Sequence, residues 1–543
     1  MSVGACKEAR RAFPVASRKQ TGGLDVQEAP ARELAAPANL EKAMSGSVLQ
    51  DGKIFIGKST KPEYLELRFA NRHGLITGAT GTGKTVTLQI LAEGFSAAGV
   101  PVFASDIKGD LSGIAAVGEP KDFLVKRAAE VGLGSDWQQR AYPTIFWDVF
   151  GTDGHPIRAT VLDMGPLLLS RMLELSEVQE GVLNIAFRVA ADEKIPVLDL
   201  KDLRAILANV SERSKELIAK YGNVATTSVG AIQRRLLVLE EQGAGQFFGE
   251  PALDIRDFMR IAPDGRGVIS ILTADKLMEK PRLYSTFLLW MLTKLWQLLP
   301  EVGDLPKPKL VFFFDEAHLL FDGAPKALLE RIEQIARLIR SKGVGVYFIT
   351  QNPLDVPNSV SAQLGNRVQH ALRAFTPLEQ KAIKAAAETF RKNPEINTER
   401  AIMELKVGEA LVSTLENKGE PSMVQRTLIR PPEGRVGPVS KEERLSVIEY
   451  SPVFNKYEET IDRESAHEIL TKRTEKAATD ANTGGGWGDV IFGGGGSTDP
   501  KAKGRQGQGM GGMIGKELQR SIARTVASTI KSIIVKSITG RSR

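Results

Sequence analysis

A glycine-rich segment near the start of the chain carries the residue types that bind phosphate. It reads Gly78-Ala79-Thr80-Gly81-Thr82-Gly83-Lys84-Thr85, is followed by Val86, and fits the pattern G-x-x-x-x-G-K-[ST]. Glycines let successive backbone N–H groups turn toward one anion, and the N-terminus of a following helix adds positive potential. Lys84 is suited to reach the β- and γ-phosphates, and the Thr85 hydroxyl to ligate Mg²⁺. We therefore expect residues 78–86 to bind ATP together with Mg²⁺.

Two adjacent acids end a second apolar segment. Leu310–Phe314 is followed directly by Asp315 and Glu316, and a fully apolar run is typical of a strand buried on both faces of a parallel sheet. From such a strand end, Asp315 would face the Mg²⁺ held by Thr85, while Glu316 points elsewhere and would polarise the attacking water. The structural alternative is a helix N-cap that follows a core strand.

Polar residues also end two other predicted strands. Gln351 follows the strand expected over 344–350 and suits a sensor of the γ-phosphate; a strand-end amide satisfied by backbone groups is the alternative. Asp106 follows the strand expected over 100–104. It would either orient the water or contact the substrate, and a salt bridge is an equally good interpretation.

A cation for the transition state has several candidates. Arg337 and Arg340 lie on the helix before the Gln351 strand and would act as an arginine finger on the ATP of a neighbouring subunit. Cations near a helix C-terminus also complement its dipole, which is the alternative role. Further candidate arginines are Arg331, Arg367 and Arg373.

The elements that position these residues alternate between strands and helices, which predicts a parallel α/β sheet. Residues 166–261 have apolar residues three and four apart, so a helical insertion is expected there. Strand-like patterning begins just after Met44, which we take as the true start. The expected organisation is a disordered extension (1–43), an ATPase core in two parts (44–165 and 262–435) around the insertion (166–261), a helical segment (436–483), a Gly-rich linker (484–512) and a basic amphipathic helix (513–543).

The composition is that of an ordinary globular protein, with 42% hydrophobic and 25% charged residues. No apolar run is long enough to span a bilayer, there is no secretory signal, and a single cysteine fits a reducing cytoplasm. Five scattered histidines show no metal-ligand spacing, so no structural metal is expected. Residues 501–543 hold ten basic residues and one acid, a net +9, so the rest of the chain carries −2 of the total +7.

The motifs, taken as an ordered set, resemble those of HerA/FtsK-type P-loop ATPases, and within them the bacterial HerA-like subgroup typified by YjgR. The matching segments are residues 78–85, Asp106–Asp110, Phe314–His318, Ala336–Gly345 and Thr350–Pro353. The resemblance covers roughly Ile54 to Pro432 together with the glycine-rich linker and the basic tail.

This resemblance implies a RecA-like core, a homo-oligomeric ring (usually a hexamer), and ATP-driven movement of DNA. By position it makes Lys84 and Thr85 ligands of phosphate and metal, Asp315 a support of Mg²⁺, and Glu316 the base. Gln351 becomes the sensor, and Arg337 or Arg340 the finger in trans. The chain departs from HerA-type translocases in having too few residues before Gly78 for their β-barrel domain, so docking of a partner nuclease and a role in end resection are not carried over.

Two functions from other classes remain open at this stage. The basic helix over 513–543 would let the chain lie on anionic lipid as a membrane-associated motor acting on protein. Packing of that helix against a neighbouring subunit is an equally good interpretation. A nucleotide-gated scaffold with negligible turnover is the third possibility, which Glu316 argues against because a scaffold does not need a base.

Overall fold

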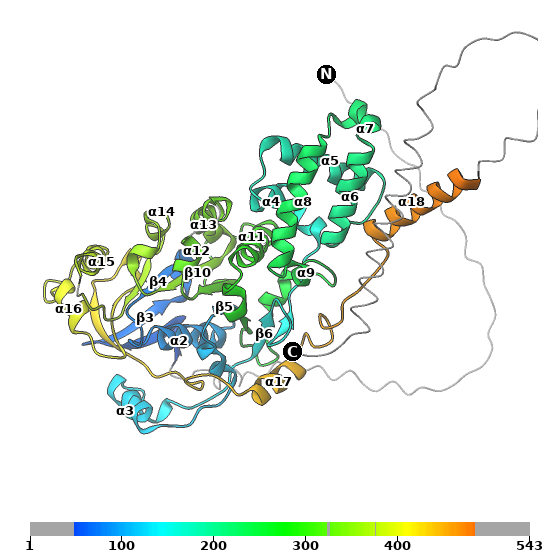
Figure 1. Ribbon diagram of the computed structural model, residues 1–543. Helices are drawn as coiled ribbons and strands as arrows, with labels where there is room; N and C mark the ends of the chain where they lie inside the picture. The colour runs from blue at the N-terminus through cyan, green and yellow to red at the C-terminus, as the bar shows by residue number, and fades with distance from the viewer. Residues whose placement is uncertain (1–47, 323–325, 375, 484–543) are drawn as a thin grey trace, which may run out of the picture. The chain divides into compact units, whose positions relative to one another are not determined.

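The computed structural model describes residues 48–322, 326–374 and 376–483 (Figure 1). A large sheet runs through this part of the chain. Its strands lie in the order β1 (Leu49–Gln50), β2 (Lys53–Lys58), β15 (Gln425–Ile429), β12 (Glu409–Ser413), β11 (Asn366–Gln369), β4 (Gly74–Thr77), β10 (Val344–Thr350), β9 (Leu310–Phe314), β5 (Val102–Asp106), β8 (Ile269–Thr273), β6 (Thr144–Asp148) and β7 (His155–Pro156).

All neighbouring strands from β11 to β7 are parallel, whereas β12, β15, β2 and β1 add an antiparallel margin. β3 (Pro62–Glu66) pairs with β2, and β13 (Leu415–Glu416) with β14 (Glu420–Pro421). In the described residues, the strand that precedes the glycine-rich loop is thus separated from β9 by β10. The predicted fold class, a mostly parallel α/β sheet of the RecA-like type, is confirmed.

Each central strand serves two hydrophobic cores because its side chains alternate between the faces of the sheet. Phe312 and Phe314 of β9 pack into the core on one face, together with α11 (Pro281–Leu298) and α13 (Lys326–Leu338). Val311 and Phe313 pack into the other core, with α2 (Lys84–Ala97). This burial on both faces explains the uninterrupted apolar sequence of the strand.

A helical region joins β7 to β8. It contains α4 (Val161–Met172), α5 (Glu177–Asp192), α6 (Leu200–Glu212), α7 (Ser214–Tyr221), α8 (Thr226–Glu241) and α9 (Ala244–Phe247). Capping boxes begin α5 at Ser176 and α6 at Asp199, and each satisfies two backbone N–H groups at the start of its helix. Leu203, Ile206 and Val210 recur at helical spacing and are fully buried. The apolar periodicity of the sequence therefore corresponds to the buried faces of these helices.

Shorter helices connect the remaining elements. They are α3 (Asp122–Val131), α10 (Asp275–Met278), α12 (His318–Phe321), α14 (Asn358–Ser361), α15 (Pro377–Glu388) and α16 (Thr398–Glu404), with 3-10 helices at Leu67–Arg72, Asp110–Ala115, Gly134–Asp136, Ile255–Met259, Ile339–Lys342 and Pro353–Asp355.

The segment that follows β15 is fastened across α2 by a buried ion pair. Arg430 Nη1 lies 3.2 Å from Glu93 Oε2, and both side chains have no exposed surface. Arg430 also donates to the carbonyl of Ile90, 2.8 Å away, and Glu93 accepts from the backbone N–H groups of Glu433 and Gly434. Burial raises the pKa of Glu93 to about 7 against the opposing charge of Arg430. The segment after β15 is thus tied to α2, the helix that begins at Lys84.

The helical segment expected over residues 436–483 contains two helices, α17 (Lys441–Glu449) and α18 (Ala466–Thr483). Pro452 lies just after α17 and cannot donate a helical hydrogen bond, so the helix ends before it. The intervening segment packs on the core through Tyr457, whose hydroxyl contacts the Asp257 carboxylate. The predicted extension (1–43), linker (484–512) and basic helix (513–543) lie outside the described residues. Among the residues that the structure describes, no helix combines the length and the apolar character needed to cross a membrane.

Candidate nucleotide site

The glycine-rich loop connects the carboxyl end of β4 to α2, and its backbone requires glycine. Gly78 has a φ of +154°, and a Cβ there would lie 2.5 Å from the Cβ of His370. Gly83, the residue before α2, has a φ of +115°, which side chains with a Cβ rarely adopt. The loop therefore follows the turn that the sequence pattern predicts, directly before a helix N-terminus.

Lys84 is folded back into this loop. Its Nζ donates to the carbonyl oxygens of Gly78 (2.7 Å) and Ala79 (3.2 Å). Burial lowers the pKa of Lys84, and the charges of Glu316 and Asp315 oppose that shift. Thr85 lies in the first turn of α2 and is half-buried. The Lys84 ammonium group therefore lies against the loop backbone, and Thr85 is the next residue of the helix.

The acid pair and Gln351 lie at the same edge of the sheet as the loop. Thr350 of β10 is in register with Thr77 of β4, and Phe348 with Phe314 of β9, so the carboxyl ends of all three strands meet there. The Thr80 hydroxyl lies 3.1 Å from Gln351 Oε1. Gln351 Nε2 in turn donates to both carboxylate oxygens of Glu316, at 3.2 Å each. Three of the residues singled out in the sequence are therefore linked side chain to side chain.

Lys108 completes this chain of contacts and was not among the site residues predicted from the sequence. Its Nζ lies 2.5 Å from Glu316 Oε1; the Lys108 side chain is 47% exposed and that of Glu316 only 6%. Burial by itself would raise the pKa of Glu316, but hydrogen bonds from Lys108 and Gln351 outweigh it and lower the pKa. Glu316 also has a φ of +48°, a conformation that costs about 1–3 kcal/mol in a non-glycine residue and is found mainly at functional sites. The one available signal was the position of Lys108 within the Asp106–Asp110 segment.

Asp315 and Asp106 form a second acidic pair, on the adjacent strands β9 and β5. Burial, reinforced by the charge of Glu316, raises the pKa of Asp315 to about 6. Burial and the charge of Asp315 raise the pKa of Asp106 to about 7. The Asp106 carboxylate accepts from the backbone N–H groups of Gly109 (2.9 Å) and Leu111 (3.1 Å), so it shapes the loop that carries Lys108.

These groups fit a magnesium nucleotide. Carboxylate and hydroxyl oxygens, as on Asp315 and Thr85, are the ligands that Mg²⁺ takes up beside phosphate oxygens. Burial, with a smaller contribution from neighbouring acids, raises the pKa values of Asp315 and Asp106, and a divalent cation beside these carboxyl groups would favour their ionised form. Over the described ranges, no group of three or more His, Cys, Asp or Glu residues is arranged to hold a metal by itself.

His370 packs against the glycine-rich loop and was not among the site residues predicted from the sequence. It is buried, with Nε2 2.8 Å from the Thr87 hydroxyl and Nδ1 3.0 Å from the Glu409 carbonyl oxygen. Burial lowers the pKa of His370 to about 4, so the ring is neutral. Its backbone N–H donates to the Thr77 carbonyl at 2.7 Å. A lone histidine after a strand carries no sequence signal for this role.

Arg337 and Arg340 lie away from the loop of their own chain. Arg340 belongs to the 3-10 helix that precedes β10, whereas the loop lies beyond the other end of that parallel strand. Arg340 Nη2 lies 3.2 Å from Asp304 Oδ1, and Arg337 Nη2 3.9 Å from Glu333 Oε2. A role of either arginine toward a neighbouring subunit stays a prediction.

The other three candidate arginines are dispersed. Arg331 donates to Gln334 on its own helix (2.7 Å), and Arg367 to the Ser361 carbonyl (2.8 Å). Arg373 alone of the three lines a pocket with Ala79, Thr80 and Gln351.

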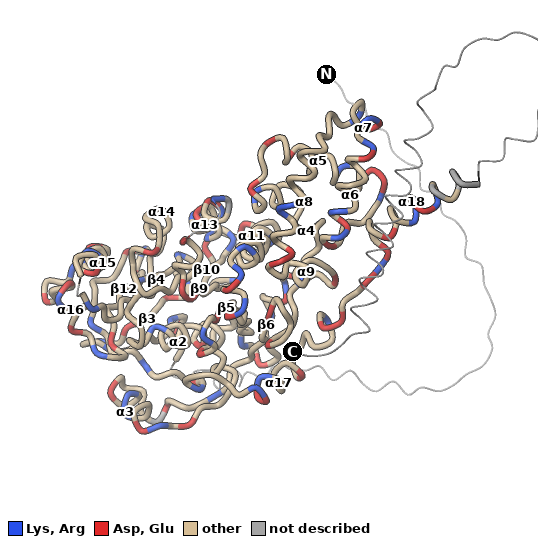
Figure 2. The backbone as a smooth tube through the Cα atoms, in the orientation of Figure 1, with Lys and Arg blue, Asp and Glu red and all other residues tan. Residues whose placement is uncertain are grey.

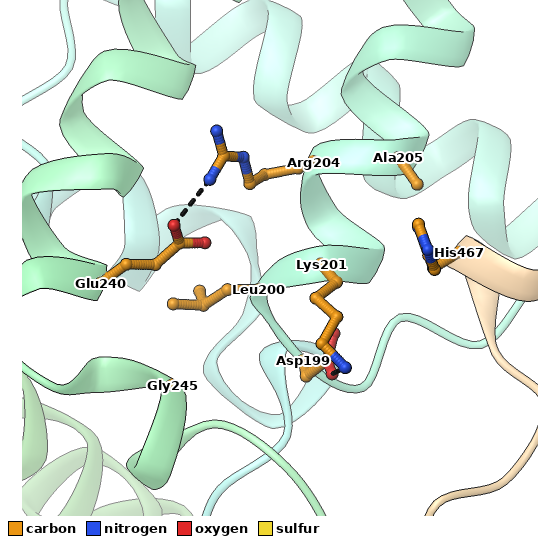
Figure 3. Close-up of a pocket in the computed structure, with 8 residues that line it drawn as sticks. All are labelled: Asp199, Leu200, Lys201, Arg204, Ala205, Glu240, Gly245 and His467. Carbon is orange, nitrogen blue, oxygen red and sulfur yellow. Dashed lines mark hydrogen bonds and ion pairs between the residues drawn. The ribbon is translucent and has the colours of Figure 1, made fainter. Parts of the chain in front are cut away.

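Two pockets flank the loop. The one lined by Thr80, Gln351 and Arg373 has a volume of about 410 Å³ and lies between the end of β10 and the segment that runs from β11 into α15. The other, of about 330 Å³, begins at Gly83 and Val86 and lies on the side of β12 and β15. A pocket of about 490 Å³ in the helical region is remote from the loop, and its Arg204 and Glu240 are paired with each other at 2.6 Å (Figure 3).

Comparison with known proteins gives one family. The family described as "Helicase HerA-like C-terminal" matches residues 52–543. No curated protein matches the sequence.

Solved structures with a similar fold have low sequence identity. The plasmid coupling protein TrwB in complex with the ATP analogue ADPNP is 16% identical, with a TM-score of 0.46 over 74% of this chain and 95% of its own. TrwB in complex with ADP and Mg²⁺ is 16% identical, with a TM-score of 0.44 over 73% and 95%. VirB4 of Thermoanaerobacter pseudethanolicus is 14% identical, with a TM-score of 0.43 over 70% and 97%.

Proposed function

The chain belongs to the HerA-like helicase family of P-loop ATPases, and from this membership we propose that it hydrolyses MgATP at residues 78–86 as a ring-forming motor that moves DNA. The observation that carries the proposal is the row of contacts from Thr80 through Gln351 and Glu316 to Lys108. It joins the phosphate-binding loop to a buried carboxylate across two strand ends.

The roles of the residues follow from their positions. The loop amides and Lys84 bind the phosphates, and Asp315 and Thr85 would hold Mg²⁺, which supplies charge neutralisation on the phosphate oxygens. Glu316 orients a water and accepts its proton. The water oxygen then bonds to the γ-phosphorus while the bond from that phosphorus to the β–γ bridging oxygen breaks, which leaves ADP and phosphate.

The surroundings of Glu316 suit this role. Its lowered pKa keeps the carboxylate ionised at neutral pH, so it can accept a hydrogen bond from water. Gln351 contacts both the loop and this carboxylate, which suits a residue that senses whether a γ-phosphate is present. When ATP binds, Lys108 would move its hydrogen bond from Glu316 to a phosphate oxygen, which would leave the Glu316 carboxylate free to accept a proton.

A shared site would explain the arginines. Arg337 and Arg340 lie at the edge of the sheet opposite to the loop, so they can serve only the nucleotide of another subunit. The DNA part of the proposal rests on the family. Lys and Arg are interspersed with Asp and Glu along the described backbone (Figure 2), so no element is assigned as the DNA-contacting face.

The test is steady-state ATP hydrolysis at two protein concentrations, with and without duplex DNA, at two salt concentrations. We expect activity per subunit to rise with protein concentration, and DNA to stimulate it most at low salt. Lys84→Ala should abolish hydrolysis, whereas Lys215→Ala, on the exposed helix α7, should not.

Three outcomes would each contradict a different part of the proposal. Absence of hydrolysis by the wild-type chain would reject the ATPase, and tight ATP binding in that case would favour the scaffold alternative. Hydrolysis indifferent to every nucleic acid would reject the DNA motor, and activity per subunit independent of concentration would argue against a shared site.

A further inference from the structure

We infer that the pocket beside α3 binds the nucleoside of the nucleotide, with Phe123 as the side chain that stacks on the base. This inference rests on the proposed nucleotide function and extends it to the recognition of the base. We call the site the α3 pocket; its apolar lining is Val86, Phe123, Leu124, Val407, Ile429, Pro431, Pro432 and Val436.

The direction of the bound phosphate chain places the nucleoside there. Glu316 and Gln351 mark the γ-phosphate end, on the β10 and β9 side of the loop. The α3 pocket starts at Gly83, at the other end of the same loop, and lies against the ends of β12 and β15 on the opposite side of β4. A triphosphate held along residues 78–84 with its γ end at Glu316 therefore directs its α-phosphate and sugar toward this pocket.

The walls of the α3 pocket suit a flat aromatic ligand. Phe123 is 62% exposed and Val407 is 70% exposed although both line a hollow, so each leaves a large apolar face uncovered. Pro431 and Pro432 offer rigid apolar surfaces from a different segment. A volume of about 330 Å³ lies within the range of small-ligand sites, which are typically lined by apolar side chains with a few polar groups. Lys126, Arg127 and Glu130 supply polar groups among the lining residues for the ribose hydroxyls and the base edge.

α3 is held in place independently of any ligand. Leu124, Ala128 and Val131 pack into a small buried cluster with Phe55 and Trp137. On another side of the helix, Arg127 Nη1 donates to the carbonyl oxygens of Gly408 (3.0 Å) and Ile429 (3.3 Å). This anchoring fixes the helix against the β12 and β15 ends while Phe123 stays outside the cluster. The backbone that carries Phe123 is thus held in place before a ligand binds, which lowers the entropic cost of binding.

The experiment compares two ligands that share a phosphate chain but differ in the nucleoside. Calorimetry on the full-length chain measures the affinity for a magnesium complex of a non-hydrolysable ATP analogue and for magnesium tripolyphosphate. Loss of one base–aromatic stack weakens binding by about tenfold, so Phe123→Ala should weaken the ATP analogue by that factor and leave tripolyphosphate unchanged. Phe123→Trp should restore the affinity.

Val125→Ala is the matched control, because Val125 is also exposed on α3 (47%) but does not line the pocket. It should bind both ligands as the wild type does. Equal affinity of Phe123→Ala and wild type for the ATP analogue would overturn the inference while leaving the proposed function intact. Equal weakening of both ligands would overturn it too, because that pattern indicates a general change in the loop. Failure of the wild type to bind either ligand would instead reject the proposed function.

Discussion

Replacement of Glu316 by glutamine tests the chemistry at the centre of the site with little disturbance of its shape. The carboxylate is almost fully buried and accepts hydrogen bonds from Lys108 and Gln351. The amide of Glu316→Gln has nearly the same volume, and its oxygen can still accept from Gln351. Lys108 loses an ionic partner, but it is half-exposed, so water replaces the carboxylate and the cost to stability is about 0–1 kcal/mol.

The effect on turnover should be far larger than the effect on folding. A general base contributes about 10²- to 10⁴-fold to the rate, or about 3–5 kcal/mol of barrier. We therefore expect kcat to fall by at least about a hundredfold while ATP still binds, because the loop and Lys84 are unchanged.

Single-turnover hydrolysis, equilibrium ATP binding and thermal unfolding, measured together, separate these effects. Glu330→Gln, an exposed acid on α13, is the matched control and should behave as the wild type. Turnover by Glu316→Gln within about threefold of the wild type would show that this carboxylate is not the base, since such a loss is well under the contribution of a base. Loss of ATP binding in the same variant would show that the Glu316 carboxylate contributes to binding of the substrate rather than to the chemical step.

Three further predictions concern the metal and the loop. Because the pKa of Asp315 is raised to about 6, its ionised fraction falls from about 0.9 at pH 7 to about 0.1 at pH 5, and the Mg²⁺-dependent gain in nucleotide affinity should fall about tenfold. Calorimetry with and without Mg²⁺ measures this gain. A gain that stays constant from pH 7 to pH 5 would contradict the assignment of Asp315 as a Mg²⁺ ligand. The same shift lowers the stability of the nucleotide-free protein as pH rises from about 4 to 6, because the native state keeps a proton that the unfolded chain has lost. Gly78→Ala would place a Cβ 2.5 Å from His370 Cβ, so we expect a stability loss of about 1–3 kcal/mol and loss of ADP binding, whereas Gly181→Ala, with open space around it in α5, should keep both. Thermal unfolding and ADP titration decide the outcome, and tolerance of Gly78→Ala would show that the close packing against His370 is dispensable.

Local patterns in the sequence were sufficient to predict the phosphate-binding loop, the position of the acid pair at a strand end and the mostly parallel sheet. The loop motif is contiguous, and Asp315 and Glu316 are marked by the buried strand that they follow. Carboxyl ends of parallel strands meet at one edge, so the approach of Gln351 to the loop also followed from strand order.

Contacts between distant segments could not be predicted in this way. His370 lies 283 positions from Thr87, and Lys108 lies 208 positions from Glu316, so nothing in the neighbouring sequence of either residue indicates its partner. The pairing of β2 with β15 likewise brings Lys58 opposite Leu428, two residues that lie far apart in the sequence. The break between α17 and α18 is a different case, because Pro452 is a local signal for it that the sequence analysis did not use.

The ion pair between Glu93 and Arg430 has a consequence for how the protein is made. The complete phosphate-binding motif leaves the ribosome more than three hundred residues before the cation that neutralises the carboxylate inside its own helix. Until that arginine emerges, Glu93 must stay hydrated or protonated, and β2 has no neighbour on the side of β15. We therefore expect chains that contain the whole motif but end before Arg430 to lack the contact that ties α2 to the segment after β15.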